Sequence, residues 1–232
     1  PMVAVACLVA MDAARDERTA PSNAAASPDA ALPAISAATI DAFVDRYHVD
    51  VIEDDLAERS PAERRAAALA HLRVGAVRLP GVAAVRVYAP DAEVDGWTSR
   101  DLVADVVTDD MPFVVESITM ELNRHGLRVH DIIHPVMRVQ RDELGRSVTL
   151  ERWTRTNAPA PSGAAATTSA TTSETPAKTP AKTTAKTTAT ESFVHVQFQR
   201  HPSGREHAEV EPGALEADLI RVLRDVRDAV ED

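Results

Sequence analysis

The order of strands and helices is decided by residues 102–140, which read LVADVVTDDMPFVVESITMELNRHGLRVHDIIHPVMRVQ. The valine-rich residues 102–107 are typical of a buried central strand, because β-branched side chains pack well on a pleated sheet. Thr108, Asp109 and Asp110 end this strand. Residues 127–140 predict another strand.

A helix is predicted between these two strands, from about Pro112 to His125. Proline is accepted in the first turn of a helix, because its missing amide hydrogen has no partner there in any case. Gly126 supplies the left-handed residue that commonly ends a helix. Apolar residues at helical spacing form the predicted buried face: Val114, Val115, Ile118 and Leu122.

The C-terminal part adds a hairpin, a strand and a helix. Gly145 is placed to form a turn, after which residues 147–153 can return as an antiparallel strand. Residues 193–198 alternate apolar and polar side chains, and Pro212 stands near the start of a long apolar-periodic helix. With the intervening linker omitted, the order from residue 101 onward is β-α-β-β-α, the ferredoxin-like order without its final strand. Both helices are expected on one face of an antiparallel sheet.

Two further helices are predicted before this unit. Residues 40–51 carry apolar side chains at helical spacing, and Thr39 is placed to cap their first amides. Ser60, Pro61 and Glu63 predict a capping box that starts a second helix, which ends at Gly75. Residues 85–87 then alternate as in a half-buried strand.

The domain organisation follows from composition. Residues 1–38, rich in Ala, Ser, Pro and Asp, are expected to form a flexible leader, and residues 39–80 a helical segment. Residues 81–232 are expected to form one α+β domain. A disordered linker of mostly Thr, Ala, Pro, Ser and Lys is predicted to interrupt this domain at residues 156–190.

The charge argues against nucleic acid as a partner, because a formal net charge of -11 offers few clustered cations for phosphates. The apolar run of residues 2–11 is shorter than the roughly 20 residues that cross a bilayer, so no membrane partner is expected. The single cysteine, Cys7, suits a reducing cytoplasm. The chain stops at Asp232 within a helical pattern, so we expect a fragment of a longer product.

No catalytic site is predicted. The chain has no glycine-rich motif for a nucleotide pyrophosphate, and Lys178, Lys182 and Lys186 all lie in the linker. No metal site is predicted either, because His130 and His134 would be about 13 Å apart along a strand. Asp109 and Asp110 are interpreted as helix-start residues that accept free amides rather than as an acid/base pair.

Several segments in series resemble the large NAD-specific glutamate dehydrogenases of bacteria. They are residues 95–97 (DGW), 108–117 (TDDMPFVVES), 121–126 (ELNRHG), 133–136 (IHPV) and 191–196 (ESFVHV). The resemblance covers roughly residues 39–156 and 190–232 and implies an ACT-type β-α-β-β-α-β module ahead of the catalytic core. It also implies a parent homo-oligomer that converts L-glutamate to 2-oxoglutarate and ammonia with NAD. This chain would serve regulation or assembly and hold no cofactor itself.

An amino-acid effector is a possible partner suggested by the resemblance. Exposed amides at the strand-to-helix corner would hold its carboxylate, as helix starts hold anions. The candidate residues are Asp109, Asp110, Met111, Phe113, Val114 and Ser117. One departure is that Pro112 is followed by Phe113, where effector-binding ACT modules commonly have glycine. The alternatives are a free-standing amino-acid sensor and an interaction protein that uses the sheet edge left by the missing last strand.

Overall fold

The computed structural model describes residues 35–231 except 50, 52–58, 153–186 and 201–210. The described part of the chain is an α+β structure with one antiparallel sheet. Its elements in chain order are α1 (Ala37–Tyr47), α3 (Pro61–Val74), β1 (Ala84–Tyr88), β2 (Leu102–Asp109), α4 (Val114–Arg124), β3 (Leu127–Ile133), β4 (Val136–Arg141), β5 (Ser147–Arg152), β6 (Thr187–Arg200) and α5 (Pro212–Glu231). The predicted fold class is confirmed.

The long strand β6 is the spine of the sheet. It pairs with β2 along one side, and along the other side it pairs with β3 and then with β4. The strand order is β1-β2-β6-β4-β5, with β3 also on β6. The single strand predicted over residues 127–140 is wrong in one respect, because His134 and Pro135 divide it into β3 and β4. Proline has no amide hydrogen to donate to the sheet.

The predicted ferredoxin-like order is confirmed by β2, α4, β3, β6 and α5, and β4 and β5 extend the sheet beyond it. The place of the final strand is not empty. β1, which precedes the unit in the chain, lies antiparallel beside β2. On β1, the Val87 amide donates to Glu216 Oε1 of α5 at 2.7 Å. The expectation of an exposed edge left by a missing last strand is therefore wrong, because the prediction did not place β1 in the sheet.

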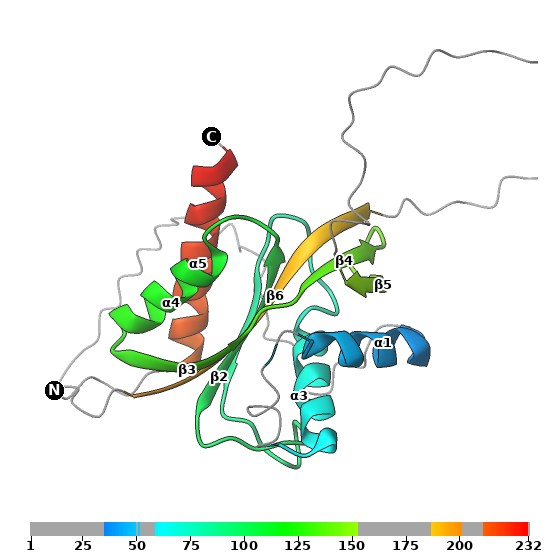
Figure 1. The fold of residues 1–232 in the computed structure, drawn as a ribbon. Helices are drawn as coiled ribbons and strands as arrows, with labels where there is room; N and C mark the ends of the chain where they lie inside the picture. The colour runs from blue at the N-terminus through cyan, green and yellow to red at the C-terminus, as the bar shows by residue number, and fades with distance from the viewer. Residues whose placement is uncertain (1–34, 50, 52–58, 153–186, 201–210, 232) are drawn as a thin grey trace, which may run out of the picture.

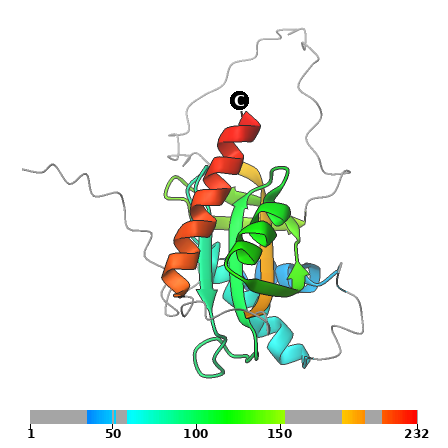
Figure 2. The same ribbon diagram turned by 90° about the vertical axis from the view of Figure 1, so that its left-hand side faces the viewer.

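Helices cover both faces of the sheet. Figures 1 and 2 show α4 and α5 side by side on one face, and α1 and α3 on the other. The first core joins Ile118 and Leu122 of α4, Leu219 of α5, and Val106 and Val196 of the central strands. The second core is formed by side chains of α1, α3 and the opposite sheet face: Phe43, Tyr47, Leu72, Val107, Met137, Val139 and Phe193. β2 and β6 are thus buried on both faces.

Two boundaries differ from the prediction. The side chain of Ser36, not Thr39, caps α1, and it accepts a hydrogen bond from the Thr39 amide. β6 begins at Thr187, so residues 187–190 belong to the sheet rather than to the linker. Their pairing with β4 explains this, because threonine is β-branched and fits a strand once a partner is available. The other predicted linker and leader residues lie outside the described part, apart from residues 35–38.

The predicted capping box at the start of α3 is confirmed. Ser60 Oγ accepts the Glu63 amide at 3.2 Å, and Glu63 Oε2 accepts the Ser60 amide at 3.0 Å. Pro61 occupies the first position of the helix. Two amides that the helix leaves without intrahelical partners are satisfied in this way.

We predict that Ser60→Ala lowers the free energy of unfolding by about 1 kcal/mol, because the hydroxyl that accepts the Glu63 amide is lost. Urea denaturation followed by circular dichroism measures the change. Ser60→Thr, which retains a hydroxyl, is the control and should keep most of the stability. Equal stability of Ser60→Ala and the wild type would contradict the prediction.

Candidate functional site

The predicted effector corner lies between β2 and α4. Asp109 ends β2, Asp110 and Met111 connect it to the helix, and α4 begins at Val114. Phe113 is 64% exposed, whereas Val114 is buried. The structure therefore gathers all six candidates at one corner: Asp109, Asp110, Met111, Phe113, Val114 and Ser117. Binding of an effector there stays a prediction.

The interpretation of Asp109 and Asp110 as helix-start caps is wrong. The Asp109 carboxylate accepts hydrogen bonds from Arg78 at 2.6 Å and from the Gly81 amide at 2.9 Å, and it also pairs with Arg227. Asp110 accepts from Ser192 Oγ at 2.8 Å. No side chain caps α4. The physical reason is that β2 continues to Asp109 and the helix begins only at Val114. Both carboxylates therefore bind groups of other elements instead of the first amides of the helix.

Phe113 adopts a left-handed backbone conformation with φ of 67°. This conformation favours glycine, because a Cβ atom crowds the following carbonyl group. Phe113 thus retains the backbone shape that glycine would give at this corner, although its residue type departs from the expected pattern. For a residue other than glycine this conformation costs about 1–2 kcal/mol.

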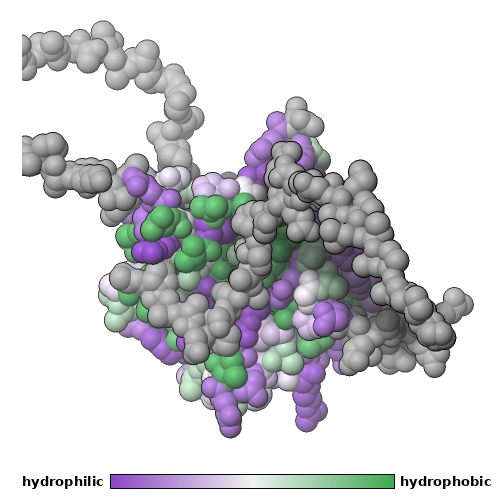
Figure 3. All heavy atoms as spheres, turned by 180° about the vertical axis from the view of Figure 1, so that it is seen from behind, coloured by the Kyte–Doolittle hydropathy of each residue, from purple (hydrophilic) through white to green (hydrophobic). Residues whose placement is uncertain are grey.

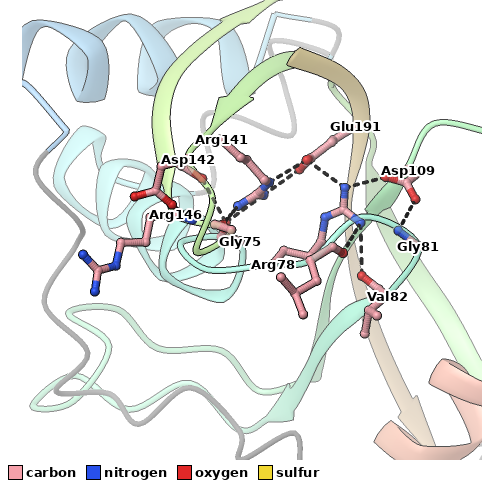
Figure 4. Close-up of polar contacts among 12 residues, drawn as sticks. Gly75, Arg78, Gly81, Val82, Asp109, Arg141, Asp142, Arg146 and Glu191 are labelled. Carbon is pink, nitrogen blue, oxygen red and sulfur yellow. Dashed lines mark hydrogen bonds and ion pairs between the residues drawn. The ribbon is translucent and has the colours of Figure 1, made fainter. Parts of the chain in front are cut away.

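A charged network lies beside this corner, where the end of α3 meets β2, β4 and β6. Figure 4 shows Arg78 and Arg141 converging on Glu191 from two sides. Arg141 Nε and Nη2 each lie 2.7 Å from a different oxygen of Glu191, and Arg78 Nη2 lies 2.7 Å from Glu191 Oε1. All three side chains are buried. Such an arrangement is stable only because the opposite charges are tightly paired.

The backbone around the network holds the two guanidinium groups in place. Arg141 Nη2 donates to the Gly75 carbonyl at the end of α3, and Nη1 donates to the Gly145 carbonyl. The Arg78 amide donates to the same Gly145 carbonyl at 2.9 Å. Gly145 has a φ of 76°, and a Cβ atom there would lie 2.6 Å from the Arg78 carbonyl oxygen. Glycine is therefore required in this hairpin turn.

The paired arginines determine the protonation of Glu191. Burial alone would raise the pKa of the Glu191 carboxyl, but its hydrogen bonds to Arg141 and Arg78 and their charges outweigh burial, so the pKa lies below its ordinary value. Glu191 is therefore ionised at neutral pH. The ionised carboxylate is what balances the two buried guanidinium groups.

A pocket of about 150 Å³ opens beside this network. Arg78, Asp109, Arg141 and Glu191 contribute its charged inner wall. The other lining residues are Leu79, Pro80, Val139, Asp142, Glu143, Gly145, Thr187 and Ala189. Of the six predicted effector residues, the pocket includes Asp109 and leaves out the rest. Sequence reasoning missed Arg78, Arg141 and Glu191 because they come from three distant segments.

A second buried polar group lies deeper under α1 and α3. Asp105 of β2 stands opposite His195 of β6, and His195 Nδ1 donates to Asp105 Oδ1 at 2.6 Å. Tyr88 donates to the other Asp105 oxygen at 2.9 Å. His71 of α3 and Tyr47 of α1 meet at 2.7 Å beside them. Asp105, His71 and His195 are completely buried.

The hydrogen-bond partners of His71 fix its tautomer. His71 Nε2 faces the Val106 carbonyl, which can only accept, so Nε2 carries the proton and Nδ1 accepts from Tyr47. Burial lowers the pKa of His71, although the Asp105 charge acts in the opposite direction. Burial alone would raise the pKa of Asp105, but the neighbouring His71 and His195 and the hydrogen bonds from His195 and Tyr88 outweigh burial, so the pKa lies below its ordinary value and Asp105 is ionised.

Two groups of side chains bring metal-ligating atoms within 4.8 Å of one another: His71, Asp105 and His195, and Glu121, His125 and Asp218. In the first group, His195 Nδ1 uses a proton to bind Asp105 and so offers no lone pair to a metal. In the second, Arg124 and Arg221 pair with Glu121 and Asp218. Both groups are satisfied by hydrogen bonds and ion pairs.

The buried histidine group was missed at the level of sequence, where only His130 and His134 were compared. One signal was present. Asp105 is the single charged residue in the otherwise apolar run of residues 102–107. A buried strand accepts a carboxylate only when partners neutralise it, so this residue predicts partners on neighbouring elements without naming them.

Comparisons with known proteins place this geometry in a family. The model of the glutamate dehydrogenase ACT1 domain matches residues 43–213, which is most of the chain. The chain belongs to the glutamate dehydrogenase ACT1 domain family. This confirms the resemblance noted in the sequence and the expected ACT-type fold.

Two relatives of this ACT1 domain are NAD-specific glutamate dehydrogenases. The protein of Halomonas elongata is 32% identical over 84% of this chain and 10% of its own length. That of Pseudomonas aeruginosa is 44% identical over 26% of this chain and 4% of its own length. The chain thus spans about a tenth of the Halomonas relative. No solved structure gives a significant match. Among the described helices, none has the length and apolar character needed to cross a membrane.

We predict that Glu191→Gln lowers the free energy of unfolding by about 3–5 kcal/mol at neutral pH, because it leaves the buried Arg141 without a counter-charge and Arg78 with Asp109 alone. The pKa of Glu191 is depressed on folding, so its contribution is present above the ordinary value of 4.5 and is lost as pH falls through the folded pKa. Denaturation at a series of pH values should show a weaker acid dependence for Glu191→Gln than for the wild type.

The matched control for this experiment is Glu93→Gln, which changes an exposed carboxylate in the same way. It should leave both the stability and its pH dependence close to the wild type. An acid dependence of Glu191→Gln identical to that of the wild type would show that Glu191 is not the group whose ionisation stabilises the fold.

We predict that Phe113→Gly raises the free energy of unfolding by up to about 1 kcal/mol, because glycine relieves the left-handed strain and the lost side chain is mostly exposed. Phe113→Ala removes the same ring but keeps a Cβ atom, so it should bring no comparable gain. Chemical denaturation compares the two variants. A Phe113→Gly variant no more stable than Phe113→Ala would exclude relief of strain.

Proposed function

We propose that this ACT1 domain is an N-terminal, non-catalytic regulatory and assembly region of a large NAD-specific glutamate dehydrogenase. The observation that carries the proposal is the match to the family over residues 43–213, together with a Halomonas relative about ten times as long as the aligned part. The parent would convert L-glutamate and NAD to 2-oxoglutarate, ammonia and NADH in the cytoplasm. NAD would bind to the parent outside this chain.

The chemistry of the described residues supports a role without catalysis. The buried ionisable groups Asp105 and Glu191 are neutralised by protein partners, which suits a structural purpose. The sequence also has no glycine-rich turn for a pyrophosphate. Hydride transfer would therefore take place in another part of the parent.

The outer face of α4 supports a role in assembly. Phe113 is 64% exposed and Met120 is 71% exposed. Phe113 is the N-cap residue of α4, and Met120 lies within the helix. Exposed Phe and Met side chains favour contact with another protein surface, because burial removes their apolar area from water. The partner would be a sister subunit or another part of the same polypeptide.

The proposal has a direct test in two parts. The purified 232-residue chain, given L-glutamate and NAD, should form no NADH. In the full-length parent, Phe113→Ser combined with Met120→Gln should weaken subunit association in analytical ultracentrifugation, because two exposed apolar side chains are lost. Val94→Ser, which changes another exposed apolar residue on a different loop, is the control and should leave association unchanged.

NADH formation by the isolated chain would overturn the non-catalytic role. Unchanged association of the Phe113→Ser, Met120→Gln parent would overturn the assignment of the α4 face to assembly. The two results are independent, so each part of the proposal can fail alone.

A further inference from the structure

An apolar patch lies on the surface beside the pocket near Arg78. Its four side chains are large and apolar, yet they are 44–60% exposed: Val77, Leu79, Val82 and Leu144. Figure 3 shows apolar patches on the side of the molecule that carries the β4–β5 hairpin. We call these four residues the Leu79 patch. Apolar residues that gather in one exposed place are typical of an interaction surface, whereas single exposed ones are common everywhere.

The β-turn of residues 79–82 forms one half of the patch. The Val82 amide donates to the Leu79 carbonyl at 3.2 Å, and Gly81 has a φ of 82°, so Leu79 and Val82 stand at the two ends of the turn. The buried Arg78 holds this turn in place, because its Nη1 donates to the carbonyls of both residues. The two apolar side chains are therefore exposed on a fixed backbone.

The β4–β5 turn forms the other half of the patch. The Leu79 side chain lies against Gly145 of this turn, and Leu144 is the residue before that glycine. Val77 forms an isolated bridge to Arg146, the residue after it. The two turns thus meet, and their apolar side chains form one surface.

The pocket within this surface suits an uncharged group. Its charged lining residues already interact with other groups of the protein: Arg78, Asp109, Arg141, Asp142, Glu143 and Glu191. The other walls include Leu79, Val139 and Ala189, which are apolar. A volume of about 150 Å³ is enough for a group of about the size of a benzene ring. An aliphatic or aromatic side chain therefore matches the pocket better than an ion does.

The end of α5 lies beside the patch. Arg227 of α5 pairs with Asp109, and a Cβ atom at Gly81 would lie 2.8 Å from Arg227 Nη1. Val230 is 42% exposed and stands three positions after Arg227, on the same side of the helix. Glu231 ends α5 about one helical turn after Arg227. The chain thus leaves α5 close to the turn that carries Leu79 and Val82.

We propose that the Leu79 patch binds the polypeptide segment that directly follows residue 232 in the parent protein, with one apolar side chain of that segment in the pocket. The inference rests on the proposed function, in which this domain is one part of a much longer polypeptide. A segment that starts beside the patch has a far higher effective concentration there than a separate molecule. Its binding holds the domain in one orientation relative to the rest of the parent.

Photo-crosslinking in the full-length parent tests which segment covers the patch. A photoreactive benzophenone amino acid replaces Leu144, which is 60% exposed, and crosslinked peptides are identified by mass spectrometry after digestion. We expect crosslinks to the peptide that begins within about ten residues after residue 232, since such a segment extends over roughly 33 Å. The same amino acid in place of Val94, an exposed residue of another loop, is the control and should not capture that peptide.

Mixed subunits separate the two sources of a crosslink. Isotopically labelled and unlabelled parent proteins are co-assembled before irradiation. Both peptides of a crosslinked pair should then carry the same label, because the segment and the patch belong to one polypeptide.

Variants test the pocket without removing a charge. Ala189→Leu fills the pocket and should release the segment, so that protease cleavage of the parent directly after residue 232 becomes about tenfold faster or more. Thr188→Leu makes a similar apolar change at the neighbouring residue of β6, which does not line the pocket, and should be cleaved as the wild type is. The melting temperature of the 232-residue chain with each substitution verifies that the domain itself is folded.

Three outcomes overturn the proposal: no crosslink from position 144 to the segment after residue 232, crosslinked pairs that join labelled to unlabelled subunits, or unchanged cleavage of the Ala189→Leu parent. The second outcome would instead make the patch a contact between subunits. None of these measurements uses NADH formation or the variants of Phe113 and Met120. Failure here would therefore leave the proposed function standing.

Discussion

The hydrogen bond between Asp105 and His195 is the interaction on which the centre of the molecule depends. Both residues lie on the two central strands and both are completely buried. A carboxylate transferred from water into a core is very costly unless partners donate hydrogen bonds to it or balance its charge. Here His195 and Tyr88 donate to its two oxygens, and His71 lies 3.6 Å away. The helices α1 and α3 must be in place to complete this environment.

The same principle explains the charged network at the end of the sheet. Glu191 lies four residues before His195 on the same face of β6, and it is held by Arg78 and Arg141. Apolar packing alone would let α1 and α3 slide over the sheet. Two buried polar groups, each with fixed partners on different elements, restrict the helices to one register. These groups cost stability and define a single arrangement of the helices.

Local elements were predictable because their signals are local. The capping box at Ser60 and Glu63, the left-handed Gly126 and the apolar face of α4 need only a few neighbouring residues, and all were found in the sequence. The place of β1 was not predictable, because it depends on pairing with β2 and on contact with α5. Asp109 shows the same limit. Its sequence neighbours suggested a helix cap, whereas its partners Arg78 and Arg227 are distant in the chain.

The candidate sites were still harder to find from sequence. His71, Asp105 and His195 are contributed by α3, β2 and β6, and no short spacing connects them. Only the lone carboxylate in the apolar run of residues 102–107 gave a hint. The pocket beside Arg78 combines the connection after α3, the β4–β5 hairpin and the start of β6 in the same way.

The position of β6 has a consequence for the order in which the chain can fold. This strand pairs with β2, β3 and β4, yet it is synthesised after all the other strands that the structure describes. While the ribosome translates residues 1–186, the nascent chain lacks β6, and Asp105 has no His195. Strand pairs that are distant in sequence also form slowly. The sheet can therefore close only after about residue 200 has left the ribosome, and until then its unpaired strands depend on protection from aggregation.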